Sequence, residues 1–234
     1  MLSPMKKLQE INIFIFFIFL SIGLFIGLIF PDFDQSFQNL LGHRSIVTHS
    51  ILLPYLIYFY QIVKKEKPNN NIVYICIGIF LGIAIHLSAD LFPKGWRGYA
   101  LIKFIGDISI GAPLSILWMS ANVYLGTQLA AKLFKNLTSK KTHTILYFII
   151  LLSLSFIYSV GDGGDSLAKF LTFTFFLGLT FYLTKGLKIK TKEPKKIKLK
   201  KDKKTEKKSK VGFWRYAVGI PLAFIIILII LGNL

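Results

Sequence analysis

Cysteine is almost absent from this sequence, because Cys76 is the single one among 234 residues. It lies inside a long apolar segment. A disulfide framework needs paired cysteines, and a cysteine-type zinc site needs several of them. Both are therefore excluded, and any metal ligands must come from other residue types.

Acidic residues are also scarce, with 11 Asp and Glu against 29 Lys and Arg, so the formal net charge is +18. A basic chain of this kind raises the question of nucleic-acid binding. Most of the charge is local, however, since residues 185–210 hold fourteen lysines and three acidic residues, a net +11. A lysine run beside apolar segments is typical of a cytoplasmic loop that contacts anionic lipid, so nucleic acid is not the expected partner.

Long apolar runs make up most of the remaining chain. Hydrophobic residues account for 53% of the sequence, and the mean hydropathy is +0.58. The runs are about twenty residues long, which is the length a helix needs to cross ~30 Å of hydrocarbon. We therefore expect an all-α, polytopic membrane protein with about seven transmembrane helices, at residues 11–30, 46–63, 72–92, 108–131, 144–160, 167–184 and 213–232.

These runs divide the chain into a helical membrane domain (1–184), a lysine-rich cytoplasmic linker (185–210) and a C-terminal transmembrane helix (211–234). Lysines gather at the N-terminus and in the loops after the second, fourth and sixth spans. Because basic loops stay on the cytoplasmic side, we expect a multi-pass protein of the inner membrane with a cytoplasmic N-terminus and an external C-terminus.

This topology brings three polar segments to one side of the membrane. PDFD (31–34) follows the first span, GHRSIVTHS (42–50) precedes the second, and HLSAD (86–90) ends the third. All three should therefore lie at the outer membrane–water interface, within a motif region that extends over 31–95.

The three segments contain side chains that bind metals, namely Asp32, Asp34, His43, His49, His86 and Asp90. Three carboxylates at one partly dehydrated place cannot all stay ionised without a cation. Imidazoles suit zinc, iron or manganese better than calcium. The set permits one catalytic ion with an open coordination position, or a pair of ions, with zinc as the expected metal and manganese or iron as alternatives.

Neighbouring residues add to this picture. Arg44 is permanently charged and could clamp a phosphate or another oxyanion. His43 and His49 are six residues apart and would point in opposed directions on a continuous helix, so two ligand roles would require a turn near Ser45. Whether His43 is a ligand or an acid–base residue stays open at this point.

Other polar residues are weaker candidates for the site. His143 lies in a lysine-rich loop on the opposite side and is expected to be solvated. Asp162 and Asp165 in GDGGDS (161–166) share the side of the site. They are either additional ligands or, as we favour, part of a glycine-rich external turn.

Glycines at helical spacing indicate how the first and third helices pack. Gly78 and Gly82 precede His86 in steps of four, and the first span has Gly23 and Gly27 at the same spacing. Small residues four apart let helix backbones approach closely. We therefore predict that these glycines bring PDFD beside HLSAD.

PDFD, then GHRSIVTHS, then HLSAD followed by FPKGW resembles the YdjM-like family of inner-membrane, metal-dependent hydrolases. The resemblance covers about residues 24–98. That family is grouped with zinc-dependent phospholipase C and nuclease P1 type enzymes. The resemblance implies a helical scaffold, phosphoester hydrolysis and a set of site residues consisting of Asp32, Asp34, His43, His49, His86 and Asp90, with Arg44 as the basic companion.

The expected function is therefore that of a membrane-embedded, metal-dependent hydrolase. Asp34, His43 and Arg44 are the candidate catalytic residues, and metal-activated water would attack a phosphoester, with membrane lipid as one candidate substrate. The alternative is a transporter that uses the His/Asp cluster for a cation or proton, although no internal repeat is visible. A third interpretation is a membrane anchor with a structural metal.

Overall fold

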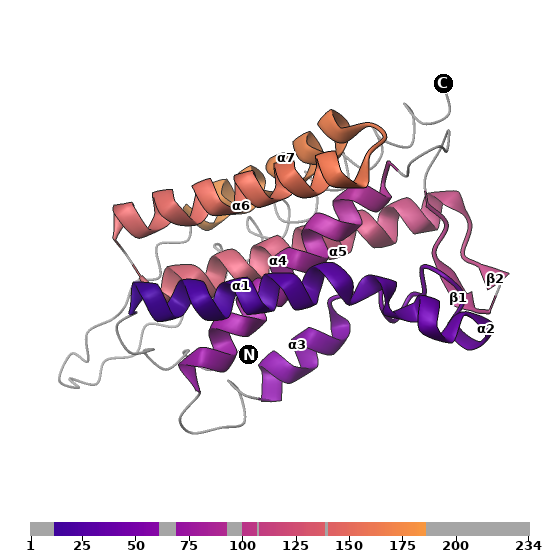
Figure 1. Cartoon of the computed structure of the whole chain (residues 1–234), viewed down its shortest axis with the longest axis horizontal. Helices are drawn as coiled ribbons and strands as arrows, with labels where there is room; N and C mark the ends of the chain where they lie inside the picture. The colour runs from indigo at the N-terminus through magenta and orange to yellow at the C-terminus, as the bar shows by residue number, and fades with distance from the viewer. Residues whose placement is uncertain (1–11, 61–68, 93–99, 107, 139, 186–234) are drawn as a thin grey trace, which may run out of the picture.

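The computed structural model describes residues 12–60, 69–92, 100–106, 108–138 and 140–185. The described chain is mostly helical (Figure 1). Three helices are long and apolar enough to cross a membrane, and a fourth qualifies if one bent pair counts as a single span. The predicted linker and the C-terminal helix at 213–232 lie outside the described residues.

The first predicted span forms α1 (Ile13–Ile29), which begins at Asn12, whose side chain caps the free N–H groups of Phe14 and Ile15. Its 17 residues are followed by the 3₁₀ helix η1 (Pro31–Phe37) and the short helix α2 (Gln38–Leu41). The axis bends by 45° between α1 and η1. PDFD therefore forms a separate helix beyond the end of α1.

Helix α4 (Asn70–Asp90) occupies the centre of the fold and packs along α1 through glycines, as predicted. A Cβ added to Gly23 would lie 2.1 Å from the carbonyl oxygen of Ile75. One added to Gly82 would lie 2.4 Å from the carbonyl oxygen of Leu24. Such backbone contact leaves no room for a larger residue, and it sets the ends of α1 and α4 side by side.

The second predicted span, 46–63, is wrong at its start. Helix α3 (Leu52–Phe59) begins six residues later and has eight described helical residues. The preceding segment is a turn tied to the rest of the protein, since the Ile46 N–H donates to the Lys103 carbonyl oxygen over 2.8 Å. The backbone groups of this segment form their hydrogen bonds with other parts of the site region, and the segment does not extend the helix.

The fourth predicted span, 108–131, also begins too early. A two-stranded antiparallel hairpin, β1 (Lys103–Ile105) and β2 (Ile108–Ser109), precedes helix α5 (Ala112–Leu137). This hairpin is an addition to the expected all-α fold. Gly111 has a φ of +82°, a conformation that ends the strand and lets the helix begin.

Helices α6 (Lys141–Asp162) and α7 (Ser166–Lys185) match the predicted spans at 144–160 and 167–184. They form an antiparallel pair along one side of the structure (Figure 1). The turn between them is fixed by the buried Lys169, whose Nζ contacts the Asp162 carboxylate and donates to the Gly163 carbonyl oxygen over 2.7 Å.

Successive long helices run in opposite directions (Figure 1). As a result, α1, α4 and α6 end at the same end of the structure, and α3, α5 and α7 begin there. The short elements η1, α2, β1 and β2 lie at this end too. The three polar segments of the sequence are therefore collected at one end of the helices.

Candidate metal centre

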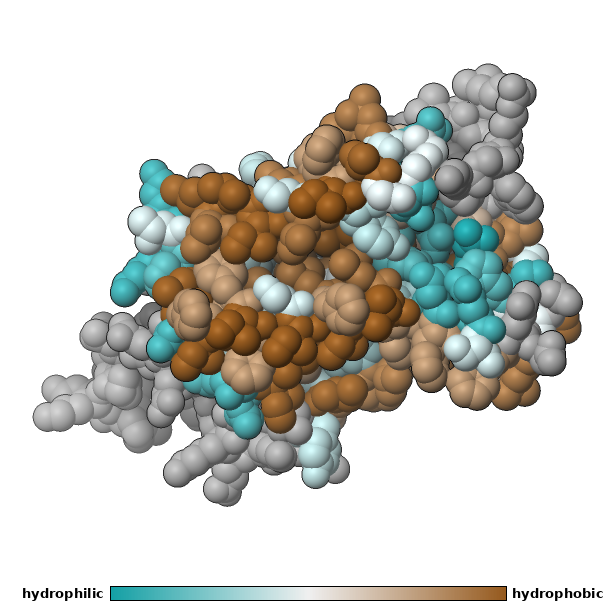
Figure 2. Space-filling view, viewed as in Figure 1, coloured by the Kyte–Doolittle hydropathy of each residue, from teal (hydrophilic) through white to brown (hydrophobic). Residues whose placement is uncertain are grey.

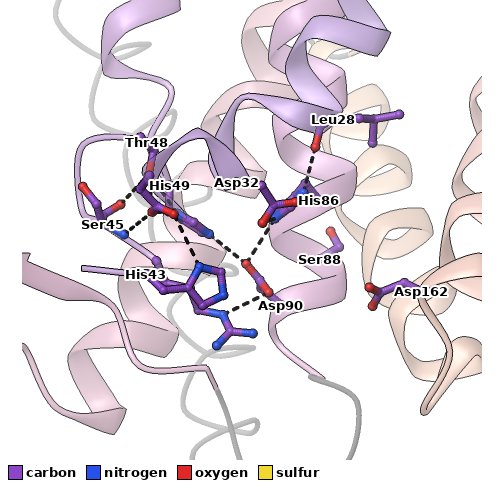
Figure 3. A network of polar contacts seen from close by, with 12 residues as sticks. Leu28, Asp32, His43, Ser45, Thr48, His49, His86, Ser88, Asp90 and Asp162 are labelled. Carbon is purple, nitrogen blue, oxygen red and sulfur yellow. Dashed lines mark hydrogen bonds and ion pairs between the residues drawn. The ribbon is translucent and has the colours of Figure 1, made fainter. Parts of the chain in front are cut away.

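His49, His86 and Asp90 form a compact group whose candidate ligand atoms all lie within 4.8 Å of one another. Oδ2 of Asp90 is 3.0 Å from Nε2 of His49 and 3.4 Å from Nε2 of His86. His86 and Asp90 are one turn apart on α4, and His49 comes from the turn before α3 (Figure 3). This group could hold a metal ion.

The tautomer of His86 is set by its second ring nitrogen. Nδ1 lies 2.9 Å from the carbonyl oxygen of Leu28, which can only accept a hydrogen bond. Nδ1 must therefore carry a proton, and in the neutral ring Nε2 has the lone pair. A backbone carbonyl behind a histidine is a common means of orienting a metal ligand.

His49 is oriented in a similar way by Asp34. Its Nδ1 lies 3.4 Å from Oδ2 of Asp34 and 3.1 Å from the hydroxyl of Thr48. Because that hydroxyl donates its own proton to the Asp34 carboxylate over 2.7 Å, its oxygen can accept a hydrogen bond from the N–H at Nδ1 of the ring. In the neutral ring, Nε2 is therefore the unprotonated nitrogen, and it faces Asp90.

Asp34 itself is fully buried and surrounded by donors. Besides the Thr48 hydroxyl, its Oδ2 accepts the backbone N–H of Ser45 over 2.6 Å. Its Oδ1 lies 3.4 Å from Nδ1 of His43. With both oxygens engaged in this way, Asp34 stands behind His49 and supports it. Its predicted role as a direct ligand stays a prediction.

A tight turn brings His43 and His49 to the same carboxylate. Arg44 has a φ of +64°, a left-handed conformation that a non-glycine residue rarely adopts. The chain then forms a bridge between Ser45 and Lys103. This is the turn near Ser45 that the spacing of the two histidines requires.

The remaining predicted residues lie at the edge of the group. Oδ1 of Asp32 is 3.9 Å from Nε2 of His86, so Asp32 is placed to complete a coordination shell. Nε of Arg44 donates to Oδ1 of Asp90 over 3.2 Å. The side chains of His43 and Arg44 are 34% and 27% exposed, so both can reach a solute that enters from water.

A cation fits this group because two of its polar atoms lack hydrogen bonds. Nε2 of His49 and Oδ2 of Asp90 are buried, and neither finds a hydrogen-bonding partner of acceptable geometry within the described residues. They nevertheless lie 3.0 Å apart. Two lone pairs at this distance repel unless a positive charge lies between them, and buried polar atoms without partners are costly. Either a metal ion or a proton on Nε2 of His49 would remove this repulsion.

A metal ion and a proton compete for Nε2 of His49, so the pKa of His49 matters for metal binding. Burial lowers its pKa, but contacts with the carboxylates of Asp34 and Asp90 outweigh burial and raise the pKa to about 9. In the absence of metal, His49 is therefore protonated at neutral pH. A metal ion has to displace this proton before it can bind Nε2.

Sequence reasoning missed several residues that position the group. The hydroxyl of Tyr158 on α6 lies 2.9 Å from Nδ1 of His86. Nε1 of Trp118 on α5 donates to the His49 carbonyl oxygen over 2.8 Å, and the Asn122 side chain accepts the Ile51 N–H over 3.0 Å. The expected topology placed the end of the helix that carries Tyr158 on the same side of the membrane as the site. This was the one feature of the sequence from which a role for Tyr158 could have been predicted.

Two weaker candidates have other partners. Asp162, in GDGGDS, pairs with the buried Lys169 and belongs to the turn between α6 and α7. His143 contacts the hydroxyl of Thr138 near the start of α6, at the opposite end of that helix from Tyr158. The position of Asp162 agrees with the turn favoured from sequence, whereas His143 is partly buried against Thr138 and not simply solvated.

The fold and the site together define a helical protein with membrane-spanning potential and a His/Asp group suited to a metal ion. Comparison with protein-family models, with curated proteins and with solved structures finds no match.

Proposed function

We propose that this protein is a membrane-embedded, metal-dependent hydrolase that acts on a phosphoester at the membrane–water interface. The observation that supports this most directly is the convergence of three candidate ligand atoms, from His49, His86 and Asp90, within 4.8 Å of one another, two of which lack a hydrogen-bonding partner among the described residues. Without a metal ion, a proton on His49 offsets the buried charge of Asp90, and a metal ion can take the place of that proton.

Zinc is the proposed metal. Two imidazoles and one carboxylate match the three-ligand sets of catalytic zinc sites, which leave a further position open. Asp32, whose Oδ1 is 3.9 Å from Nε2 of His86, could close that position or belong to a second ion. The same donors are compatible with iron or manganese, so the metal must be identified by measurement.

Once bound, such an ion would polarise a phosphoryl oxygen and make a water molecule acidic enough to act as a nucleophile. The protein supplies the remaining functions. Arg44 presents a permanent positive charge beside Asp90 and can orient an anionic oxygen of the substrate. His43, partly exposed and in contact with the buried Asp34, can accept and release a proton.

The proposed placement is a multi-pass protein of the inner membrane with about seven spans, a cytoplasmic N-terminus and the site facing outside. Support comes from the alternating directions of the helices and from the lysine pattern of the sequence. In a Cys76→Ala background, a cysteine placed at the exposed Gly161, near the end of α6, should then react with a membrane-impermeant reagent added to intact cells, and one placed at Lys141 should not.

The test of the proposed function combines metal analysis with turnover. Wild-type protein purified in detergent should contain stoichiometric metal and hydrolyse a soluble phosphodiester such as bis(p-nitrophenyl) phosphate. His86→Ala should lose both properties. His143→Ala is the matched control, since it removes a histidine that contacts Thr138 and not the site, and it should keep both.

The alternatives give different results in the same experiment. A structural metal would be present without turnover of any phosphoester. A transporter would move cations into proteoliposomes and would lose this movement in His86→Ala. Turnover that survives complete removal of the metal would disprove the hydrolase mechanism.

A further inference from the structure

The end of the structure that holds the candidate metal centre also carries an apolar surface. Five large apolar side chains on η1, α2 and the hairpin are 49% to 69% exposed, and we call them the apolar tip: Phe33, Phe37, Leu40, Phe104 and Ile108. They lie outside the three helices that qualify as spans by themselves, although Phe33 and Phe37 belong to η1, which together with α1 forms the bent pair that could count as a fourth span. Exposed apolar clusters of this kind mark sites of contact with another protein or with a membrane.

The apolar tip is a packed unit. The rings of Phe33 and Phe37 lie 5.4 Å apart. The Gly106 N–H donates to the Leu40 carbonyl oxygen over 3.2 Å, which ties α2 to the hairpin. A Cβ on Gly42 would lie 2.0 Å from the Gly106 carbonyl oxygen, so the two backbones touch. The exposure of these side chains is therefore a property of a fixed surface.

The length of α1 suggests what covers this surface. Its 17 residues extend about 25 Å, which is shorter than the ~30 Å of hydrocarbon in a bilayer. If α1 starts at one face of the bilayer, its last part falls short of the other face, and η1 has to lie at the boundary between acyl chains and headgroups. Phe33 and Phe37 would then lie at the depth where apolar side chains are stabilised.

Figure 2 shows how hydrophobic and hydrophilic residues are distributed on one face of the structure. An apolar belt covers the helices, and a hydrophilic band separates it from further apolar residues at the end that bears α2 and the hairpin. The metal-binding group belongs to the same end as the band.

We propose that the apolar tip inserts into the boundary region of the surrounding lipid leaflet and holds the candidate metal centre at the level of the phospholipid phosphates. This proposal rests on the proposed function for the identity of the site and specifies its substrate class: a phosphoester of a membrane lipid, whose acyl chains remain in the bilayer during the reaction. Arg44, partly exposed beside Asp90, is the cation that would meet the headgroup phosphate.

The insertion can be measured without any assay of hydrolysis. In a Cys76→Ala background, single cysteines at Phe37 and Phe104 carry nitroxide labels in vesicles of phosphatidylethanolamine and phosphatidylglycerol. Two reference labels come from α6, namely Ile149→Cys, which is exposed on a spanning helix, and Lys141→Cys at the helix start. The readout is accessibility to oxygen relative to a water-soluble nickel complex.

The labels at Phe37 and Phe104 should shift toward the oxygen-rich behaviour of the Ile149 label. Behaviour like that of the Lys141 label would place the tip in water and overturn the proposal. Spin–spin broadening between labels on separate molecules would mean that a second copy covers the tip, and this too would overturn it.

A second measurement concerns the substrate. Phe37→Ser and Phe104→Ser should each raise KM for a phospholipid in vesicles about tenfold, because each removes a large apolar contact with lipid. Their turnover of a soluble phosphodiester should stay unchanged. Inserted labels without any hydrolysis would disprove the proposed function and leave the insertion intact. Unchanged kinetics on vesicles would disprove the lipid assignment alone.

Discussion

The hydroxyl of Tyr158 lies 2.9 Å from Nδ1 of His86, the same nitrogen that contacts the Leu28 carbonyl oxygen. Two oxygens from two different helices therefore hold one imidazole, and they leave its Nε2 directed at Asp90. In this way α6 helps to orient a candidate metal ligand.

Removing this hydroxyl should weaken metal binding without abolishing it. Partners behind a metal ligand typically contribute 10–100-fold in affinity. Because Leu28 still fixes the tautomer, we expect Tyr158→Phe to lower zinc affinity by about tenfold, at the lower end of that range. Competition with a chromophoric chelator measures this directly. Tyr182→Phe, at an exposed tyrosine on α7, is the matched control. Equal affinities in both variants would show that Tyr158 does not support His86.

The glycine contact between α1 and α4 should control the site from a distance. A leucine at Gly82 cannot be accommodated, because its Cβ alone would lie 2.4 Å from the Leu24 carbonyl oxygen. We expect Gly82→Leu to separate the helices, to cost about 1–3 kcal/mol or more in stability, and to lower metal content although every ligand is present. Thermal unfolding in detergent and elemental analysis measure the two effects.

Gly178→Leu supplies the control for this substitution. Gly178 lies on α7, and a Cβ there meets no atom within 4 Å. The same increase in volume should therefore leave unfolding and metal content unchanged. If Gly82→Leu behaves like Gly178→Leu, the close approach of α1 and α4 is not what brings PDFD to HLSAD.

The sequence predicted the gathering of the site because that feature depends on helix periodicity and alternating helix direction. His86 and Asp90 are four residues apart, so one helix face had to carry both. The spacing of Gly23, Gly27, Gly78 and Gly82 identified the packed helix pair. Those features are local, or follow from the order of the spans, and can be read from one chain.

The arrangement of roles within the site was less predictable. Oδ2 of Asp34 accepts hydrogen bonds from the Ser45 N–H and the Thr48 hydroxyl, which hold the carboxylate behind His49. Both contacts depend on the left-handed turn at Arg44. The same turn takes up the residues before α3, so the helix starts late. It also pairs with Lys103 in the hairpin of β1 and β2. Tertiary hydrogen bonds of this kind leave no periodic signal in a sequence.

Metal binding should release a proton and should strengthen as the pH rises. The pKa of His49 is raised to about 9 in the folded, metal-free protein. Protonated His49 therefore stabilises the fold fully at pH values below the pKa of the unfolded chain, and this stabilisation is lost as the pH rises through about 9. A metal ion must displace that proton, so affinity should increase from pH 6 to about 9. Calorimetry in buffers of different ionisation enthalpy counts the protons released. A constant affinity over this interval would show that His49 is not a ligand.

The pair formed by the buried Lys169 and the exposed Asp162 should respond unequally to removal of its two members. Lys169 is fully buried, and its Nζ also donates to the Gly163 carbonyl oxygen over 2.7 Å. Asp162→Ala leaves that ammonium buried without its carboxylate; because the Asp162 side chain is 41% exposed, the cost should lie below the ~3–5 kcal/mol typical of breaking a fully buried pair. Lys169→Met removes the buried charge and keeps a side chain of similar length, so its cost should be much smaller. Thermal unfolding of both variants in the same detergent gives the comparison. If Lys169→Met is the more destabilising change, the turn between α6 and α7 depends on the lysine as a hydrogen-bond donor to Gly163 more than on charge pairing.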